Sequence, residues 1–361
     1  MRRWYFTSES VTLGHPDKMC DFISDSILDM ALSNDEDSKM AVETSIKNNK
    51  IWIFGEAKTK AKLNYTEIVN TALKKIGYDE EFIISVDVDE QSPEINNAVT
   101  HSDGEIGAGD QGIMFGYACN ETDEYMPMPI YYANKLAKRL SDIQHKYDFL
   151  GVDGKTQVTI EYHNDKPIRV DTIVISTQHS KNVDVKDFSD LLLHEVIESV
   201  IDKNLIDKNT KILFNPSGSF VLGGPYGDSG TTGRKIICDT YGGYARIGGG
   251  CFSSKDPSKV DRSAAYYCRY VAKNVVAHGF ASKCEIQVSY AIGLSDPLSI
   301  MVETFNTEKV SLDIINNYIK ENFSFNVSNI IKELDLKKPI YAETAGYGHF
   351  GNDRFQWEKI V

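Results

Sequence analysis

The sequence lacks the features that mark several large classes of protein. No apolar run approaches the roughly 18 residues that a membrane-spanning helix needs. The six cysteines are scattered and form no Cys-x-x-Cys pair, so a disulfide framework and a structural zinc site are both disfavoured. No apolar segment follows the opening Met-Arg-Arg-Trp-Tyr-Phe, and we therefore expect no signal peptide and a cytoplasmic protein.

Basic charge is also scarce. The chain has 39 Lys and Arg against 52 Asp and Glu, which gives a formal net charge of −13. Such an excess of negative charge argues against binding to nucleic acid, and we expect neither a nucleic-acid nor a membrane partner. The 361 residues, 41% of them hydrophobic, suffice for two or three domains with well-filled cores.

Two glycine-rich loops, residues 223–235 and 248–261, stand out from this acidic background. Five Lys and Arg face four Asp across residues 222–261, so this segment carries a net charge of +1. Glycine lets backbone N–H groups close around an anion, Lys and Arg add full charge, and Asp suits a magnesium ion that bridges phosphates. The composition predicts a polyphosphate held with the help of a metal ion, with ordinary hairpin turns as the alternative.

Neither loop is a Walker A motif. Five residues separate Gly227 from Gly233, one more than that motif has, and Arg-Lys follows in place of Lys-Ser or Lys-Thr. An ordinary P-loop nucleoside triphosphatase is therefore disfavoured.

Hydrophobic periodicity predicts three β-hairpins whose turns are rich in Asn, Asp or Pro. The paired strands are expected at residues 39–46 and 51–54, 157–162 and 168–175, and 285–290 and 300–303. After each hairpin, apolar residues recur at helical spacing and predict an amphipathic helix. These residues are Ile68, Ala72, Leu73 and Ile76, then Leu192, Leu193, Val196, Ile197 and Val200, and finally Ile314, Ile315 and Ile319.

The recurrence of a hairpin followed by a helix predicts an α+β fold of three similar domains. We place the boundaries at residues 1–103, 104–221 and 222–361. Further helices are expected at residues 18–33, 130–145 and 263–278.

Two shorter motifs also carry polar groups. Gly14-His15-Pro16-Asp17-Lys18 precedes the first helix: Asp17 suits magnesium and His15 suits a phosphate oxygen, with a helix cap and a solvated loop residue as alternatives. Residues 107–112 spell G-x-G-x-x-G, but the residues before them are polar rather than strand-like. Dinucleotide binding is therefore disfavoured, while Asp110 remains a candidate for binding an amino group.

Taken together, these motifs resemble those of the S-adenosylmethionine synthetase family. The resemblance includes Thr7-Ser-Glu-Ser-Val, Gly14-His-Pro-Asp-Lys, Gly107-Ala-Gly-Asp-Gln-Gly, Ser176-Thr-Gln-His-Ser, residues 223–261 and Tyr347-Gly-His-Phe-Gly. It covers nearly the whole chain. It implies three α+β domains with pseudo-threefold symmetry, in a homodimer with shared active sites that often pairs into a tetramer.

The resemblance also implies a reaction and its site residues. ATP and L-methionine would give S-adenosylmethionine, with magnesium (two ions per site) and potassium as cofactors. The implied triphosphate and catalytic residues are His15, Lys155, Arg234, Lys235, Lys255 and Lys259, and the implied nucleoside residues are Asp153, Phe220 and Asp228. Cys251 is a further implied ATP-binding residue. The implied methionine residues are Glu56, Gln91, Asp110, Asp228 and Lys259, and the implied metal ligands are Asp17 and Asp261 for magnesium and Glu43 for potassium.

Some positions depart from the family pattern. Cys251 replaces a usual Ala, Ser254 a usual Gly, and Ser219 an Arg found in many bacterial members. The run from Tyr78 to Gln91 is short and leads into residues 91–101, which resemble the family's mobile gate over the active site.

Methionine sulfur is already nucleophilic, so attack on C5′ of ATP requires no general base. The leaving triphosphate requires cations and metal, and the bound triphosphate is then hydrolysed. A nicotinamide oxidoreductase, an ATP-dependent ligase or kinase, and a non-catalytic nucleotide-binding protein are the competing classes. Binding of NAD, the identity of the products and the absence of turnover would distinguish them.

Overall fold

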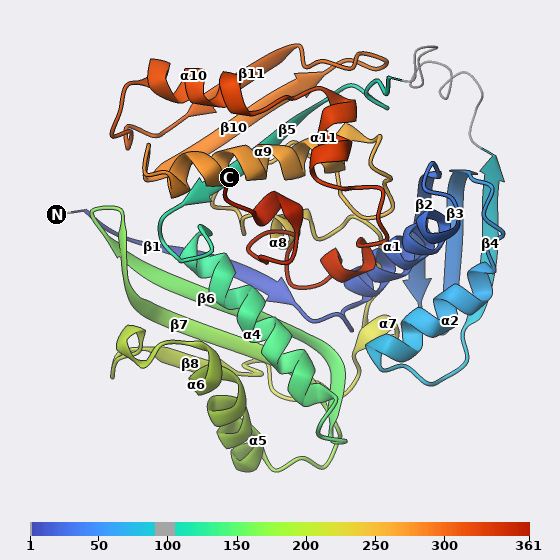
Figure 1. Ribbon diagram of the computed structural model, residues 1–361. Coiled ribbons are helices and arrows are strands. Elements are labelled where there is room, and N and C mark those ends of the chain that lie inside the picture. The colour runs from blue at the N-terminus through green and yellow to red at the C-terminus, as the bar shows by residue number, and fades with distance from the viewer. Residues whose placement is uncertain (1, 91–104) are drawn as a thin grey trace.

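The computed structural model describes residues 2–90 and 105–361 and shows strands gathered into three sheets with helices packed on them (Figure 1). The strands are β1 (Arg3–Val11), β2 (Lys39–Lys47), β3 (Lys50–Lys58), β4 (Ile83–Glu90), β5 (Gly112–Cys119), β6 (Leu150–His163), β7 (Lys166–His179), β8 (Lys211–Phe214), β9 (Gly230–Thr231), β10 (Lys283–Tyr290) and β11 (Ser299–Glu303). The helices are α1 (Pro16–Asn34), α2 (Tyr65–Ile76), α4 (Met128–Gln144), α5 (Val185–Leu191), α6 (Glu198–Val200), α7 (Gly224–Gly227), α8 (Ile236–Asp239), α9 (Val260–Ala277), α10 (Leu312–Asn322) and α11 (Val327–Glu333).

All three expected hairpins are confirmed. β2 pairs antiparallel with β3, β6 with β7, and β10 with β11. In the first two turns, Asn48, Asn164 and Asp165 have φ angles of 52°, 48° and 61°. Asn and Asp tolerate this left-handed region better than most residues, so the turn chemistry of the sequence matches the backbone that the hairpins need.

The three sheets exchange strands in a cycle. Their orders are β1-β6-β7-β8, β4-β3-β2-β9 and β11-β10-β5. The sheet of the central third therefore takes β1 from the first third, the sheet of the last third takes β5, and the sheet of the first third takes β9. Three similar sheet-and-helix units are present, but each is completed by a strand from another third. The linear boundaries at residues 103 and 221 stay a prediction.

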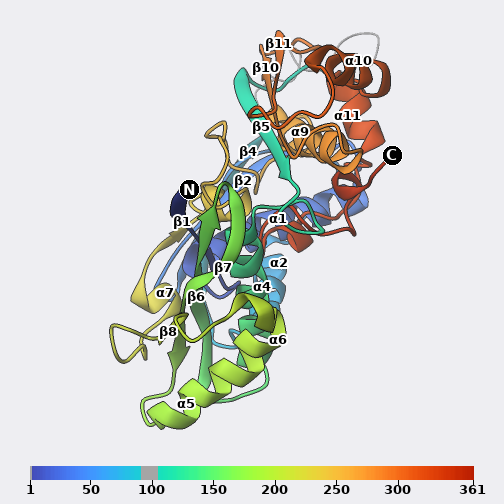
Figure 2. The ribbon, with the colours of Figure 1, turned by 90° about the vertical axis from the view of Figure 1, so that its left-hand side faces the viewer.

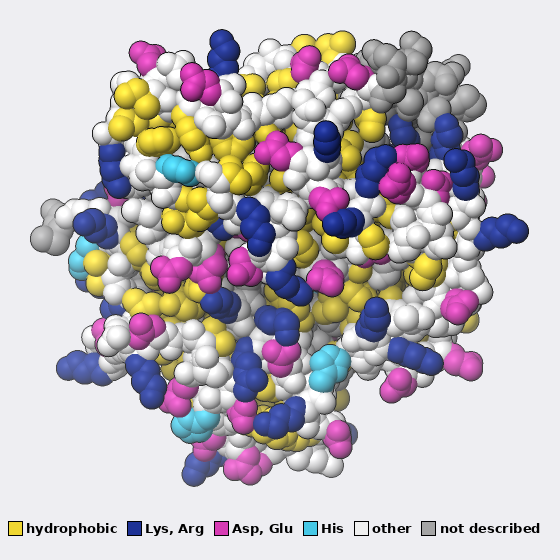
Figure 3. All heavy atoms as spheres, viewed as in Figure 1, with side chains coloured by type: hydrophobic (Ala, Val, Ile, Leu, Met, Phe, Trp, Pro, Cys, Tyr) yellow, Lys and Arg dark blue, Asp and Glu magenta, His cyan; other side chains and the backbone are white. Residues whose placement is uncertain are grey.

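One face of each sheet packs on a long helix. α1 packs on β2, α4 on β6 and β1, and α9 on β5 and β10. In the side view of Figure 2, α9, α10 and α11 lie to one side of the β5–β10–β11 sheet. Each sheet also keeps large apolar side chains exposed: Tyr5 on β1, Trp52 on β3 and Ile113 on β5. Acidic and basic side chains are interspersed over the face drawn in Figure 3.

The expected helices are present with small differences. α2 ends at Gly77, whose φ of 110° provides a left-handed C-cap. The helix of the second unit contains a π-helical turn, Leu192–Ile197, between α5 and α6. In α10, Ile315 and Ile319 are buried but Ile314 is half-exposed, so the expected apolar stripe is wrong at that position. Within the described part of the chain, no helix combines the length and apolarity needed to cross a membrane.

Strand β5 lies directly against the backbone of α9 at Gly116. A Cβ atom at this position would lie 2.0 Å from the carbonyl carbon of Cys268 and 2.1 Å from the amide nitrogen of Arg269. Both obstructing atoms are backbone atoms, so no side-chain rotation relieves the overlap. Glycine is therefore required where this sheet meets its helix.

We expect Gly116→Ala to lower the free energy of unfolding by at least about 1–3 kcal/mol, because the added methyl group separates β5 from α9. Urea unfolding measures the change. Gly346→Ala is the matched control, since its nearest obstructing atom is Leu13 Cδ1 at 3.4 Å. Equal stabilities for the two variants would contradict the close strand–helix contact.

Candidate active site

The N-terminus of α1 holds the first group of expected site residues. His15, rather than Asp17, caps this helix: its Nδ1 accepts a hydrogen bond from the Asp17 backbone N–H at 3.2 Å. Because Nδ1 accepts, the proton of the neutral ring is on Nε2. Burial lowers the pKa of His15 to about 3, with the nearby positive charges of Lys235 and Lys155 acting in the same direction. His15 is therefore a neutral N–H donor near pH 7.

Asp17 connects α1 to the first glycine loop. Its carboxylate is buried, accepts a hydrogen bond from the Thr231 N–H at 3.0 Å and forms an ion pair with Lys235. Arg234 Nε lies 3.5 Å from the same carboxylate. Two loop cations thus meet one buried carboxylate at the start of the helix.

Strand β6 adds Asp153 and Lys155 beside this group. Asp153 Oδ2 accepts the Gly224 N–H at 2.8 Å, whereas its Oδ1 is buried without a hydrogen-bond partner among the described residues. Burial raises the pKa of Asp153. The pKa of Asp228 is lowered by the Ser229 N–H and also by the positive charges of Arg234 and Lys155. The structure therefore brings together expected residues from all three thirds of the sequence.

A second group lies around the start of α9. Lys255 Nζ contacts Asp261 at 2.6 Å, and Lys259 forms an ion pair with the buried Asp256. The Asp261 carboxylate packs so closely on Gly250 that a Cβ there would lie 2.4 Å from its Cγ. The loop that carries Asp110 is bound to this region through Gly109 N–H, which donates to Ser258 O at 3.2 Å.

The outward face of the β2–β3 hairpin adjoins the second group. Ala41 on β2 forms an isolated bridge with Lys255 and is paired with Glu56 on β3. The charge of Glu43 lies close enough to act on the Cys251 thiol, whose pKa is raised mainly by burial. Both glutamates thus lie on the side of this sheet that faces the second loop.

The two glycine loops touch each other. A Cβ at Gly233 would lie 2.7 Å from Cys251 Sγ, and Gly233 has a φ of 81°. Phe220 lies beside the end of β7, where its N–H donates to His179 Nε2 at 3.1 Å. Gln91 lies outside the described residues.

The expected magnesium ligands, Asp17 and Asp261, are carboxylates that belong to the two groups of site residues. Within residues 2–90 and 105–361, no three or more His, Cys, Asp or Glu side chains form a metal-binding group. Asp17 and Asp261 each present one carboxylate held by a lysine. Magnesium at phosphate sites takes one or two carboxylates and completes its shell with phosphate oxygens and water. The two aspartates fit a magnesium ion that arrives with a polyphosphate.

Several polar residues of this region were not singled out from the sequence. Asp256 accepts hydrogen bonds from Met40 N–H at 2.8 Å and Ser258 N–H at 2.9 Å as well as pairing with Lys259. Asp21 and Asp25 lie beneath the loops, fully buried. Asp17, Asp21 and Asp25 follow one another at intervals of four residues, and this spacing is the signal that reading the motif alone misses.

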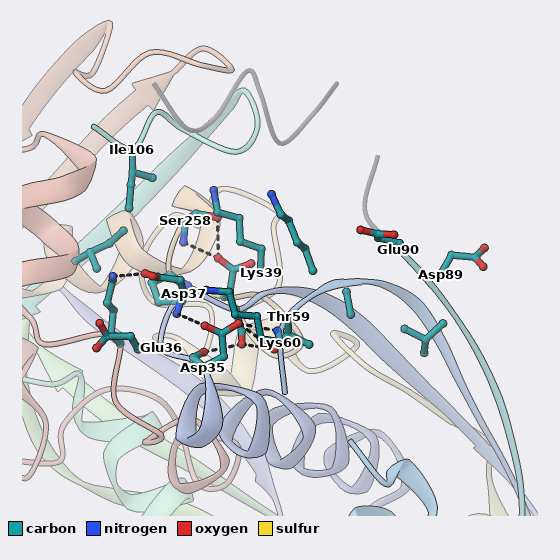
Figure 4. A pocket seen from close by; sticks show the side chains of 18 of the residues that line it. Asp35, Glu36, Asp37, Lys39, Thr59, Lys60, Asp89, Glu90, Ile106 and Ser258 are labelled. Atoms are coloured by element: carbon teal, nitrogen blue, oxygen red, sulfur yellow. Dashed lines mark hydrogen bonds and ion pairs between the residues drawn. The ribbon is translucent and has the colours of Figure 1, made fainter. Parts of the chain in front are cut away.

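A cavity of about 850 Å³ lies between the ends of β2 and β3 and the Asp256–Ser258 turn (Figure 4). Two of the carboxylates that line it have partners: Asp35 accepts the Lys60 N–H at 2.8 Å, and Asp37 contacts Lys337 at 2.6 Å. The second glycine loop contributes Asp256, Pro257 and Ser258 to the lining, but none of Lys155, Arg234, Lys235, Lys255 and Lys259 lines the cavity.

The low pKa of His15 has a direct test. We expect its imidazole to stay neutral from pH 8 down to pH 5, because its pKa is about 3 in the fold and ordinary when unfolded. Protons bind the unfolded state first, so this group lowers stability as pH falls below about 6.5. Carbon-13 NMR of the histidine rings measures the titration. Exposed His194 is the internal control, since its bond to Glu198 raises its pKa. A His15 ring that titrates near pH 6.5 would contradict the buried, cation-flanked site.

Comparison with known proteins agrees with this geometry. Models of the N-terminal, central and C-terminal domains of S-adenosylmethionine synthetase match residues 3–102, 105–220 and 222–359. The chain is 52% identical, over 372 aligned positions, to the S-adenosylmethionine synthase of Sorangium cellulosum (strain So ce56), covering 99% of this chain and 88% of that protein. These matches span the strands, loops and helices that build both groups of site residues. The chain belongs to the S-adenosylmethionine synthetase family.

Proposed function

We propose that this protein forms S-adenosylmethionine from ATP and L-methionine by attack of the methionine sulfur on C5′. The bound triphosphate is then hydrolysed to pyrophosphate and phosphate. The observation that carries the proposal is the pair of glycine loops, which touch at Gly233 and Cys251. Their lysines and arginine lie against buried or half-buried carboxylates. The family match supports the same reaction.

The cations act on the leaving group. Lys155, Arg234, Lys235, Lys255 and Lys259 surround the triphosphate and stabilise the negative charge that it gains as the bond to C5′ breaks. His15 donates from Nε2, the nitrogen left free by its capping bond, to the leaving oxygen. No general base is needed, because the sulfur attacks as a neutral nucleophile. A neutral His15 is therefore compatible with the role.

Asp153 is the strongest candidate for holding the nucleoside. Its Oδ1 is buried and unpartnered among the described residues, and a ribose hydroxyl would satisfy it. Phe220 and Asp228 line the rest of the nucleoside site in this proposal, and Cys251 contributes to the ATP site from the second glycine loop. Methionine is held by Glu56, Asp110, Asp228 and Lys259, together with Gln91 from outside the described residues.

Magnesium and potassium complete the proposal. Asp17 and Asp261 would hold two magnesium ions, which would supply positive charge to the triphosphate oxygens. Glu43 holds potassium. Lys235 and Lys255, which pair with the two aspartates here, are then available to the phosphates.

We also propose a homodimer with shared active sites that pairs into a tetramer. The exposed Tyr5, Trp52 and Ile113 support it, since each extends from a different sheet on the side away from its long helix. Apolar side chains of this size on three neighbouring sheets suit burial against a second copy.

The proposed reaction is tested by mass spectrometry of products formed from ATP, methionine, magnesium and potassium. We expect S-adenosylmethionine with pyrophosphate and phosphate, and about a 10²–10³-fold lower turnover for Lys255→Ala, because the variant removes charge at the leaving group. Lys208→Ala, which changes an exposed lysine away from the loops, is the control. AMP with pyrophosphate and no sulfonium product would overturn the proposal.

The proposed assembly is tested by light scattering beside activity as the protein is diluted. We expect dimers or larger species, with activity lost as monomers form. Trp52→Asp should weaken association by placing charge on an apolar contact, whereas Leu312→Asp, on α10 of the helical side, should not. A fully active monomer would contradict the shared site.

A further inference from the structure

Helix α1 carries an aspartate on every turn of one face. Asp17, Asp21, Asp25 and Asp29 are four residues apart, a spacing that stacks side chains along one side of a helix. We call these four residues the aspartate stripe. Like charges at this spacing destabilise an isolated helix, and burial adds a desolvation penalty. A buried stripe of this kind therefore requires compensating partners.

Each member of the stripe accepts a backbone N–H from a distant loop. Asp17 accepts from Thr231 at 3.0 Å and Asp21 from Gly233 at 2.8 Å, both in the first glycine loop. Asp25 accepts from Ser254 at 3.0 Å in the second loop.

Asp29 differs from the other three members. It accepts the N–H groups of Tyr341 and Ala342, both at 2.8 Å, in the C-terminal segment. One helix thus organises three separate segments of chain, and only its last aspartate has no bond to a glycine loop.

The contacts of Asp21 and Asp25, the two middle members of the stripe, are alike in detail. Gly233 and Ser254 both have left-handed backbones, with φ angles of 81° and 77°. Each donates its N–H to a fully buried aspartate and is followed directly by a cation of the proposed site, Arg234 or Lys255. A left-handed non-glycine residue is strained, so Ser254 is held in this conformation by its surroundings.

Buried cations complete both contacts. Lys18 Nζ contacts Asp21 at 2.9 Å and also pairs with Asp239, so one ammonium serves two carboxylates. Arg262 forms two bonds of 2.8 Å to Asp25 and also donates to Lys255 O at 3.1 Å. The second loop is therefore held on both sides of the Ser254–Lys255 peptide bond.

We propose that Asp21 and Asp25 are positioning residues that set the distance between Arg234 and Lys255 by binding the preceding backbone N–H groups to a single helix. This inference rests on the proposed function for the role of the two cations. The loops alone leave each cation on a flexible, glycine-rich segment. Bound to successive turns of α1, the loops hold the cations at a fixed separation, as the charge distribution of a triphosphate requires.

Asp21 provides the cleaner experiment, because changing Asp25 would leave Arg262 buried without its partner. Asp21→Ala removes the acceptor for Gly233 N–H. Asp21→Asn keeps an acceptor oxygen and leaves Lys18 paired with Asp239. Asp29→Ala is the matched control, since it removes the same kind of bond from the same stripe at a segment outside the glycine loops. If Asp21→Ala folds poorly, Asp21→Ser replaces it in the comparison.

Three readouts are measured on each full-length variant: hydrogen–deuterium exchange of residues 229–235, affinity for inorganic tripolyphosphate by calorimetry, and kcat and KM. We expect Asp21→Ala to exchange faster in this loop, to bind tripolyphosphate about tenfold more weakly and to lose about 10–100-fold in kcat. Asp21→Asn should restore all three. Asp29→Ala should lower thermal stability and leave the three readouts unchanged.

The inference would be overturned if Asp21→Ala kept the wild-type exchange rate and tripolyphosphate affinity. It would also be overturned if Asp29→Ala changed the three readouts as much as Asp21→Ala does, or if Asp21→Asn did not restore them. Hydrogen–deuterium exchange of residues 229–235 tests the contact between Asp21 and Gly233 independently of any reaction. A wild-type protein that makes no sulfonium product overturns the proposed function instead, so the two failures are distinguishable.

Discussion

The structure depends on the neutralisation of charge buried beneath two glycine loops. α1 takes three carboxylates, those of Asp17, Asp21 and Asp25, out of water. Unpaired carboxylates at such depth would be protonated or would unfold the helix. Backbone N–H groups of the loops and the cations Lys18, Lys235 and Arg262 supply what the carboxylates need. The loops and the helix therefore hold each other in place, and neither has this conformation by itself.

The cyclic exchange of strands places this arrangement at the junction of the three sheets. β1 leaves the first third for the central sheet and leads directly into His15 and α1, while β9 leaves the last third for the first sheet and carries Thr231. Gly230 approaches α1 so closely that a Cβ there would lie 2.2 Å from Pro16 O. Such backbone contact is possible because residue 230 has no Cβ atom, and the pairing of β9 with β2 holds the strand there. Residues from all three thirds thus reach one site by pairing of strands and not by flexible linkers.

The electrostatics of the site separate groups that hold charge from groups that stay neutral. The lysines of the loops are paired with carboxylates in the absence of a ligand, and these pairs offset the desolvation free energy of holding the lysine charges in the site. His15 is kept neutral by burial and by the positive charges of Lys235 and Lys155. This division suits a site that binds a polyanion. Fixed cations stabilise the phosphate chain, and the neutral imidazole donates a directed hydrogen bond without transferring its proton.

The sequence by itself determined the elements and the chemistry of this protein. Alternating apolar residues around Asn48 and Asn164 predicted the hairpins because turn geometry is local, and the loops of Gly, Lys, Arg and Asp predicted anion binding because composition sets the local charge. Only the tertiary structure decided which strand completes which sheet, because strand exchange depends on contacts between residues far apart in the chain. It also decided that His15 caps α1 and that Asp21 and Asp25 bind Gly233 and Ser254. Aspartates four residues apart appear in a sequence as an ordinary polar helix face, and their burial follows only from the loops folded over them.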